Sequence, residues 1–296
     1  MNGTQFRGTT VALVTPFRQN GEIDEERLRQ LVDWHIEQGT DVILACGTTG
    51  ESATLSHEEH HRVMEIIIQQ ANGRVPVLAG AGSNSTAEAI SLTQFAEKAG
   101  ADGILSVGPY YNKPTQEGFY QHFKAIAEST QLPVILYNVP GRTGTNISAE
   151  TTLRLAQIPN IVGIKEASGK FSQIMEILRQ RPEGFVVLSG DDSITLPLIA
   201  LGGDGAISVV ANEVPTLFHE MVHLAFRNQW EKARALHFRL LPLMEMNFVE
   251  TNPIPVKTAL ALMGKIEENF RLPLVKMSPS NRVSLRNLLH SLKLIA

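Results

Sequence analysis

Short apolar segments recur along this chain, and each is followed by a stretch with helical patterning. Eight such runs, spaced by about 30 residues, lie at 9–14, 42–45, 75–79, 103–107, 134–137, 161–165, 185–188 and 206–209. Short runs rich in apolar and β-branched residues and bounded by turn residues are typical of buried strands. The alternation of strand and helix therefore predicts a parallel sheet with right-handed crossovers.

Residues that can cap a helix precede several of the predicted helices. These helices are expected to begin near Asp24, Ser56, Thr86, Thr115, Ser148, Lys170 and Ser193. Ser56-His57-Glu58-Glu59 has the pattern of a capping box, in which the first and last side chains each bond the other's backbone N–H. The caps support a division of the chain into β/α units.

Eight β/α units favour an α/β fold of the closed (β/α)8 type, the TIM barrel. The alternative is an open doubly wound sheet, which often carries a G-x-G-x-x-G loop after its first strand. Here the first strand runs into Thr15-Pro16-Phe17, and Gly80-Ala81-Gly82 lacks the third glycine. A G-x-x-x-x-G-K-[ST] loop is also missing. We therefore predict a barrel without a dinucleotide site.

The strand pattern stops near residue 228. The remaining residues have helical patterning, and prolines are expected to separate the helices. These prolines are Pro242, Pro253, Pro255, Pro273 and Pro279. We predict a catalytic barrel over residues 1–228 and a C-terminal helical domain over residues 229–296. The helical domain would either cover the outside of the barrel or form an oligomer contact, and the sequence leaves both open.

Charge and cysteine content narrow the classes of function. The formal net charge is -4 and the pI is about 6.2, and no basic stripe with interleaved aromatics suggests nucleic-acid binding. Cys46 is the only cysteine, which fits a reducing compartment but also a secreted protein without disulfides. Residues 1–10 lack the apolar core of a signal peptide, and no apolar run is long enough for a membrane span. We expect a cytoplasmic protein that binds neither membranes nor nucleic acids.

Lys165 ends the sixth predicted strand, where an ammonium group has little room. Burial disfavours the charged form of a lysine, and a neutral amine can attack a carbonyl to form a Schiff base. The alternative is that the side chain reaches from the strand end to water. In a barrel the active site forms at the C-terminal ends of the strands, so Lys165 is a candidate catalytic residue.

Other polar residues follow strand ends and should converge near Lys165. Gly47-Thr48-Thr49-Gly50 can bind a carboxylate through backbone N–H groups, or can be a tight turn only. Tyr137 can relay protons, or it can simply pack in the barrel. Arg142 can bind a carboxylate with two hydrogen bonds, or it can be a solvated charge on a loop. Tyr110-Tyr111 and Asp191-Asp192 end the fourth and seventh strands.

Three further groups carry weaker signals. His57, His60 and His61 share a helix but lack the H-E-x-x-H pattern of a metal site, so no metal is predicted. Cys46 reads as a small buried residue rather than a nucleophile. Asp191-Asp192 can serve as an acid/base pair or metal clamp, although a helix N-terminus that favours negative charge is the simpler explanation.

The motifs together resemble the 4-hydroxy-tetrahydrodipicolinate synthase (dihydrodipicolinate synthase) family, within the N-acetylneuraminate lyase superfamily of class I pyruvate aldolases. The resemblance covers nearly the whole chain. It rests on residues 47–51, on Tyr110-Tyr111-Asn112-Lys113-Pro114, on residues 137–143 and on Gly163-Ile164-Lys165-Glu166-Ala167. It implies a (β/α)8 barrel with a C-terminal helical domain, in a homotetramer built from dimers.

The resemblance also implies roles for individual residues. Lys165 would form a Schiff base with pyruvate, and Tyr137, Thr48 and Tyr111 would relay protons, with Tyr111 reaching a neighbouring subunit. Thr48 and Thr49 would bind the pyruvate carboxylate, and Arg142 the carboxylate of L-aspartate 4-semialdehyde. Gly190 and Ile207 would line the site. No metal or organic cofactor is implied, because the lysine is the covalent catalyst.

Two further expectations follow from the resemblance. Sugar-acid aldolases and lyases of the same superfamily share the lysine, the tyrosine and the threonine loop, so they are the alternative, and residues 140–143 favour the synthase. L-Lysine is expected as a feedback inhibitor. Its predicted site comprises Ser52, Ala53, His57, His60, Asn84, Glu88 and Tyr110.

Overall fold

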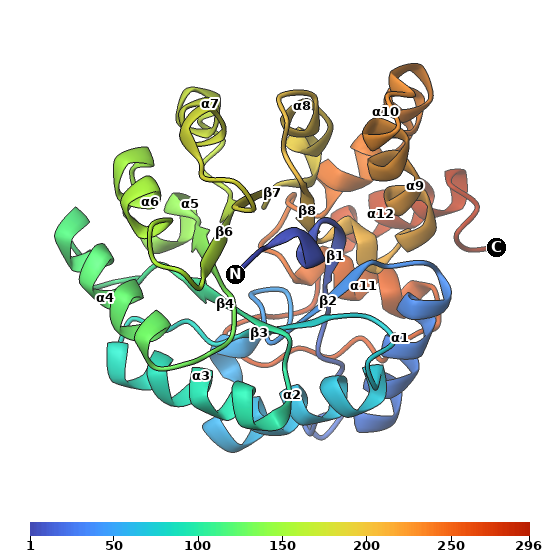
Figure 1. Cartoon of the computed structure of the whole chain (residues 1–296). Helices are drawn as coiled ribbons and strands as arrows, with labels where there is room; N and C mark the ends of the chain where they lie inside the picture. The colour runs from blue at the N-terminus through green and yellow to red at the C-terminus, as the bar shows by residue number, and fades with distance from the viewer.

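Eight parallel strands close into a barrel in chain order in the computed structural model, which describes all residues, 1–296 (Figure 1). The strands are Gly8–Ala12 (β1), Val42–Ala45 (β2), Val77–Gly80 (β3), Gly103–Val107 (β4), Val134–Asn138 (β5), Ile161–Glu166 (β6), Val186–Ser189 (β7) and Gly205–Ser208 (β8). Closure is direct, because Thr10 of β1 pairs with both Val42 of β2 and Ile207 of β8. The predicted (β/α)8 barrel is confirmed.

The predicted strand positions hold, with small shifts at several ends. β3 begins at Val77 rather than at residue 75. The reason is Pro76, which has no N–H to donate to the ladder, although its carbonyl accepts from the Ile43 N–H. β1 ends at Ala12 rather than at residue 14, because the Val14 N–H bonds the Asn212 side chain instead of a strand.

Helices surround the barrel in a ring (Figure 1). They are Glu25–Glu37 (α1), His57–Ala71 (α2), Thr86–Ala99 (α3), Gln116–Glu128 (α4), Pro140–Thr143 (α5), Ala149–Leu155 (α6), Phe171–Gln180 (α7), Thr195–Ala200 (α8), Pro215–Phe226 (α9), Trp230–Met246 (α10), Ile254–Leu262 (α11) and Pro279–Ser291 (α12). Four short 3-10 helices are Thr4–Phe6 (η1), Ser52–Thr54 (η2), Asp192–Ile194 (η3) and Val210–Asn212 (η4).

The predicted helix starts agree with the observed caps in most cases. The Asp24, Thr115 and Ser148 side chains accept backbone N–H bonds at the first turns of their helices. The Ser56 capping box is present with both of its reciprocal bonds. The last predicted start is displaced, because residue 193 lies in η3 and α8 begins two residues later.

The core has two layers that follow the alternation of side chains along each strand. In β2, Val42 and Leu44 point into the barrel, whereas Ile43 and Ala45 face the surrounding helices. Phe6 of η1 belongs to the inner cluster and closes the N-terminal end of the barrel. A Cβ on Gly103 would lie 2.6 Å from the Phe6 ring, so this position needs a glycine.

The C-terminal helices α10, α11 and α12 pack beside α9, α8 and one another (Figure 1). They follow α9, and the predicted boundary at residues 228 and 229 lies in the turn between α9 and α10. No helix is both long and apolar enough to cross a membrane.

One expectation for this region is wrong. Pro242 was expected to separate helices, but it lies inside α10. The helix continues because Leu240 and Leu243 on either side of it are fully buried. The carbonyl that loses its donor belongs to Phe238, which is 62% exposed, so water can bond it. Pro253, Pro255 and Pro279 do mark helix starts, at the cap of α11 and in the first turns of α11 and α12.

Candidate active site

Tyr137 and Lys165 occupy paired positions on the adjacent strands β5 and β6. Paired residues of neighbouring strands point to the same face of the sheet, which here is the barrel interior. The Lys165 Nζ lies 4.3 Å from the centre of the Tyr137 ring. Both residues are near the C-terminal ends of their strands, where a barrel places its active site.

The Lys165 amine is held in conditions that favour its neutral form. The residue is 6% exposed, and burial lowers its pKa to about 7. The Asp192 carboxylate opposes this shift, and the Arg142 guanidinium adds to it. Gly190 gives the side chain its space, because a Cβ there would lie 3.0 Å from the Lys165 Cε. The alternative in which the lysine reaches out to water is therefore excluded.

Tyr137 remains protonated in the same environment. Burial raises the pKa of its hydroxyl, and the Arg142 charge and a hydrogen bond with the Thr48 side chain only partly offset this effect. A neutral phenol beside a hydroxyl can both donate and accept a proton. The Tyr137–Thr48 pair can therefore carry protons to and from a group bound at Lys165.

The loop Gly47-Thr48-Thr49-Gly50 is a tight turn after β2, and it also presents free donors. The Gly50 N–H donates to the Gly47 carbonyl at 3.0 Å, and the Glu51 N–H donates to the Thr48 carbonyl at 3.1 Å. No hydrogen bond within the chain uses the N–H groups of Thr48 and Thr49. Adjacent free N–H groups suit an anion, so the turn and the carboxylate site are compatible.

A buried ion pair lies directly behind this loop. Glu51 follows the loop with φ +53°, and its carboxylate accepts a hydrogen bond from Lys257 of α11. Both side chains are 0% exposed. The Lys257 Nζ also lies 4.3 Å from the centre of the Phe17 ring, and burial lowers its pKa to about 8. The pair connects the threonine loop to the C-terminal helices.

Asn252, which precedes α11, is a site residue that the sequence analysis missed. Its side-chain amide donates to the Thr49 hydroxyl at 3.1 Å, and its carbonyl accepts from the Arg142 Nη2 at 3.2 Å. A cavity of about 150 Å³ is lined by Lys165, Tyr137, Thr48, Arg142 and Asn252 among others. The C-terminal region therefore contributes to the active-site cavity as well as covering the barrel.

The two aspartates after β7 differ in role. Asp191 caps η3 by accepting from the Ser193 N–H at 3.0 Å. This agrees with the expectation that a helix N-terminus favours negative charge here. Asp192 instead turns inward, where its Oδ2 accepts from the N–H groups of Val209 and Val210 at 3.0 and 2.8 Å. Burial raises the pKa of Asp192 to about 6, and its Oδ1 has no partner. Asp192 thus adjusts the charge near Lys165 and ties β7 to β8.

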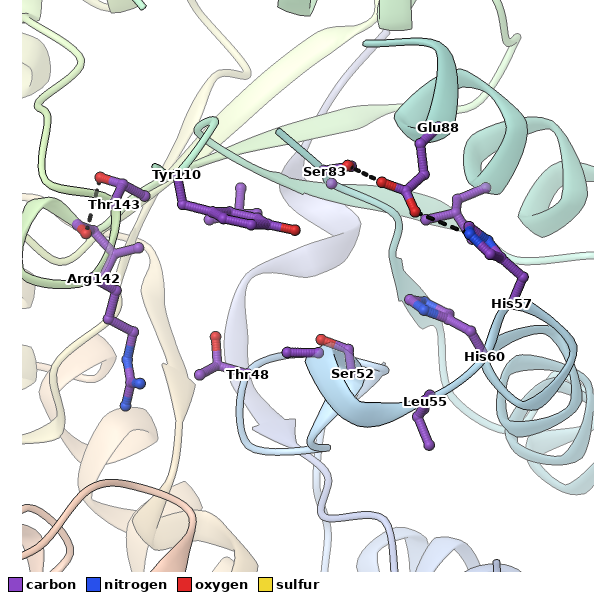
Figure 2. A pocket seen from close by; sticks show the side chains of 15 residues that line it. Thr48, Ser52, Leu55, His57, His60, Ser83, Glu88, Tyr110, Arg142 and Thr143 are labelled. Carbon is purple, nitrogen blue, oxygen red and sulfur yellow. Dashed lines mark hydrogen bonds and ion pairs between the residues drawn. The ribbon is translucent and has the colours of Figure 1, made fainter. Parts of the chain in front are cut away.

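A larger cavity of about 370 Å³ shares Thr48, Val139 and Arg142 with the cavity at Lys165. Figure 2 shows its lining, with Glu88 and His57 on one side and Tyr110 and Arg142 on the other. Six of the seven residues predicted for lysine binding line it: Ser52, Ala53, His57, His60, Glu88 and Tyr110. Asn84 does not line this cavity, and its carbonyl accepts from the Asn112 side chain at 2.8 Å.

Glu88 is the only carboxylate in the lining of this larger cavity. One of its oxygens lies 3.1 Å from the His57 Nε2, and the other accepts from the Ser83 hydroxyl (Figure 2). The His60 Nε2 is within 2.8 Å of the Gly80 carbonyl, and His61 stacks on Phe95 at 3.7 Å. The three histidines therefore have separate partners and do not converge on one point.

The remaining predicted residues fall in different places. Ile207 is buried in the inner barrel cluster with Tyr137. Tyr111 lines neither cavity, is 90% exposed and has a left-handed backbone with φ +70°. Cys46 is buried, which raises the pKa of its thiol and keeps it protonated, so it packs rather than reacts.

Comparison with known proteins points to one family. The model of the dihydrodipicolinate synthetase family matches residues 5–292. A 4-hydroxy-tetrahydrodipicolinate synthase of Syntrophus aciditrophicus is 57% identical over 290 residues, which are 98% of this chain and 99% of that protein.

Two solved structures are similar over nearly their whole length. A dihydrodipicolinate synthase of Acinetobacter baumannii complexed with pyruvate has a TM-score of 0.96 at 50% identity, covering 98% of this chain and 99% of the other. A related enzyme of Cyanidioschyzon merolae with lysine bound has a TM-score of 0.96 at 43% identity, with the same coverage.

Proposed function

We propose a role for each residue of the site on the premise that this chain belongs to the dihydrodipicolinate synthetase family. Its reaction is that of a 4-hydroxy-tetrahydrodipicolinate synthase, a lyase of the diaminopimelate route to lysine. The substrates are pyruvate and L-aspartate 4-semialdehyde. The relatives that match over nearly the full length are 4-hydroxy-tetrahydrodipicolinate synthases, which favours the synthase over a sugar-acid aldolase.

The observation that carries the residue assignment is the buried Lys165 amine, whose pKa is lowered to about 7. At neutral pH a large fraction of this amine is unprotonated and can attack the keto carbon of pyruvate. The free N–H groups of Thr48 and Thr49 would hold the pyruvate carboxylate. Lys165 thus serves as the covalent catalyst, and no metal or organic cofactor is required.

The proposed reaction runs from an imine through an enamine to ring closure. The Lys165 Nζ adds to the keto carbon, and water leaves as the imine forms. The imine withdraws electrons, so the methyl group loses a proton through Tyr137 and Thr48 to give an enamine. The enamine carbon attacks the aldehyde, and the resulting alkoxide takes a proton. The amino group of the second substrate then attacks the imine carbon, closes the ring and releases Lys165.

Reduction with borohydride in the presence of pyruvate tests this assignment. The hydride would convert the imine into a stable secondary amine, and mass mapping of peptides locates it. We expect one pyruvate adduct per chain, on Lys165. An adduct on another lysine, or none under turnover conditions, would falsify the mechanism.

The rate of pyruvate capture is expected to rise with pH through about 7 and then level off. Only the neutral amine attacks, so protonation of Lys165 below its pKa of about 7 lowers the rate. The acidic limb of kcat/KM for pyruvate, measured from about pH 5.5 to 9, reports this group in the free enzyme. A rate that keeps rising up to about pH 9 without levelling off would show an ordinary lysine pKa and contradict the assignment.

Arg142 is proposed to bind the carboxylate of L-aspartate 4-semialdehyde. It lines the Lys165 cavity, and the Asn252 carbonyl holds its guanidinium at 3.2 Å. Arg142→Ala should raise KM for this substrate by about 10- to 100-fold, the effect of losing a charged hydrogen-bonded pair. The measurement is initial rates with pyruvate saturating.

Arg142→Lys is the matched variant, because it keeps the charge but loses the bidentate geometry, and should fall between wild type and alanine. Pyruvate trapping on Lys165 should persist in both variants. Unchanged KM for the semialdehyde in Arg142→Ala would remove Arg142 from the substrate site.

Tyr111 is proposed to act on a neighbouring subunit. Its side chain is 90% exposed and lines neither of the two cavities described above, although its neighbour Tyr110 lines the larger one. A homotetramer built from dimers would cover this side chain and bring it to a second active site. Light scattering at assay concentration tests the assembly, and a fully active monomer would contradict it. A cytoplasmic location is also proposed, and the free Cys46 is compatible with such a reducing compartment.

L-Lysine is proposed to bind the larger cavity as a feedback inhibitor. The Glu88 carboxylate suits an ammonium group, and the shared residues Thr48 and Arg142 connect this cavity to Lys165. A bound ligand could therefore change the active site through these shared residues. The similar structure with lysine bound supports a lysine site in this fold.

Glu88→Gln should weaken lysine binding by about tenfold or more, because it removes the only carboxylate of the cavity. Calorimetric titration of L-lysine measures the affinity, and initial rates measure inhibition. Glu58→Gln on the exposed surface of α2 has the same charge change outside the cavity and should leave both unchanged. Absence of heat and inhibition at millimolar lysine in the wild type would refute the regulatory site.

A further inference from the structure

A cluster of two histidines and one aspartate lies away from both cavities. His219 and His223 are one turn apart on α9, and Asp41 immediately precedes β2. The Asp41 Oδ2 lies 2.9 Å from the His223 Nε2 and 3.3 Å from the His219 Nδ1. Because Asp41 is at the start of a strand, the cluster is at the N-terminal end of the barrel, opposite the active site.

These donor atoms converge as the ligands of a metal ion do. One nitrogen of each histidine and one Asp41 oxygen all lie within 4.8 Å of one another, and no other group of three His, Cys, Asp or Glu does so. Ligands bonded to zinc at about 2.0–2.2 Å in a tetrahedron lie about 3.3–3.6 Å apart. The 3.3 Å distance from Asp41 to His219 matches that separation and the 2.9 Å distance to His223 is shorter, so a small rotation of the side chains would admit an ion.

The surrounding backbone is arranged to hold the carboxylate in place. The Thr9 N–H donates to the Asp41 Oδ2 at 2.7 Å, which orients the carboxylate toward α9. A Cβ on Gly8 would lie 2.3 Å from the same oxygen, so a larger residue at position 8 would displace it. The His219 Nδ1 is buried and faces this oxygen at 3.3 Å without a well-directed hydrogen bond. Poorly bonded buried polar atoms cost free energy, and a metal ion between the two atoms would bond both of them.

We propose that Asp41, His219 and His223 bind a divalent transition-metal ion of the zinc class. Two imidazole nitrogens and one carboxylate oxygen form a donor set that suits zinc, and three protein ligands leave a fourth position for water. The ion would join α9, which follows the last strand, to the starts of β1 and β2. It would therefore stabilise the closure of the barrel rather than take part in the reaction.

Calorimetric titration of the full-length, chelator-treated protein with Zn²⁺ tests this site. We expect one ion per chain from this cluster in the wild type. His219→Gln and His223→Gln should each weaken zinc binding by about 100-fold or more, since even changes outside the ligand set cost about 10- to 100-fold. Both side chains are partly exposed, so both variants should fold, and either one alone suffices for the test.

His57→Gln is the matched control, because His57 is an exposed histidine near a carboxylate in the larger cavity. It should retain the zinc affinity of the wild type. Thermal melting gives a second readout: Zn²⁺ should raise the Tm of the wild type and of His57→Gln, but not of the α9 variants. Unchanged zinc affinity in both α9 variants, or no binding by the wild type, would overturn the proposal.

Discussion

Lys165→Met is expected to lower kcat by about 10³-fold or more and to prevent pyruvate trapping by borohydride. Methionine is of similar length and is apolar, so it suits a position that is 6% exposed and bordered by Gly190. The fold should therefore be kept while the amine is lost. A 10³-fold loss corresponds to about 4 kcal/mol of transition-state stabilisation. Steady-state rates and peptide mass mapping measure the two effects.

Lys170→Met provides the control for this experiment. Lys170 lies five residues further on, is exposed and precedes α7 without capping it through its side chain. Its replacement should leave both the rate and the adduct on Lys165 unchanged. If Lys165→Met kept more than about a tenth of the wild-type kcat, covalent catalysis by Lys165 would be wrong.

The fold was predictable because its pattern repeats. Each β/α unit combines a short apolar run with a helix, several of them capped, and all eight predicted strands are present. The errors lie at the ends of elements, where single residues decide, as with Pro76 at the start of β3. Pro242 shows the limit of local rules, because burial of Leu240 and Leu243 keeps α10 helical across it.

The site residues on strand ends could be collected from the sequence, because the barrel brings those ends together. The pairing of Tyr137 with Lys165 follows from the register of β5 and β6. Asn252 was not predictable in this way, since it belongs to a loop before α11 with no strand pattern to place it. Asp191 and Asp192 were both noted in the sequence, but only the fold shows that Asp192, unlike Asp191, turns inward.

Lys257→Met is expected to lower the free energy of unfolding by about 3–5 kcal/mol, the largest stability effect that we predict. It leaves the Glu51 carboxylate buried at 0% exposure without its cationic partner. Glu51 also follows the Thr48-Thr49 loop in a left-handed conformation, so movement of its side chain would disturb the proposed pyruvate site. Urea unfolding measures the stability, and KM for pyruvate should rise in the same variant.

A double-mutant cycle separates the loss of the ion pair from the loss of packing. Glu51→Gln alone should cost less than Lys257→Met, because Lys257 has a pKa of about 8 and can become neutral. Adding Glu51→Gln to Lys257→Met should recover much of the lost stability, since the buried charge is then removed. If the two changes were simply additive, or if Lys257→Met cost less than about 1 kcal/mol, the pair would not anchor the loop. The Phe17 ring 4.3 Å from the Lys257 Nζ would then account for the position of this lysine by packing alone.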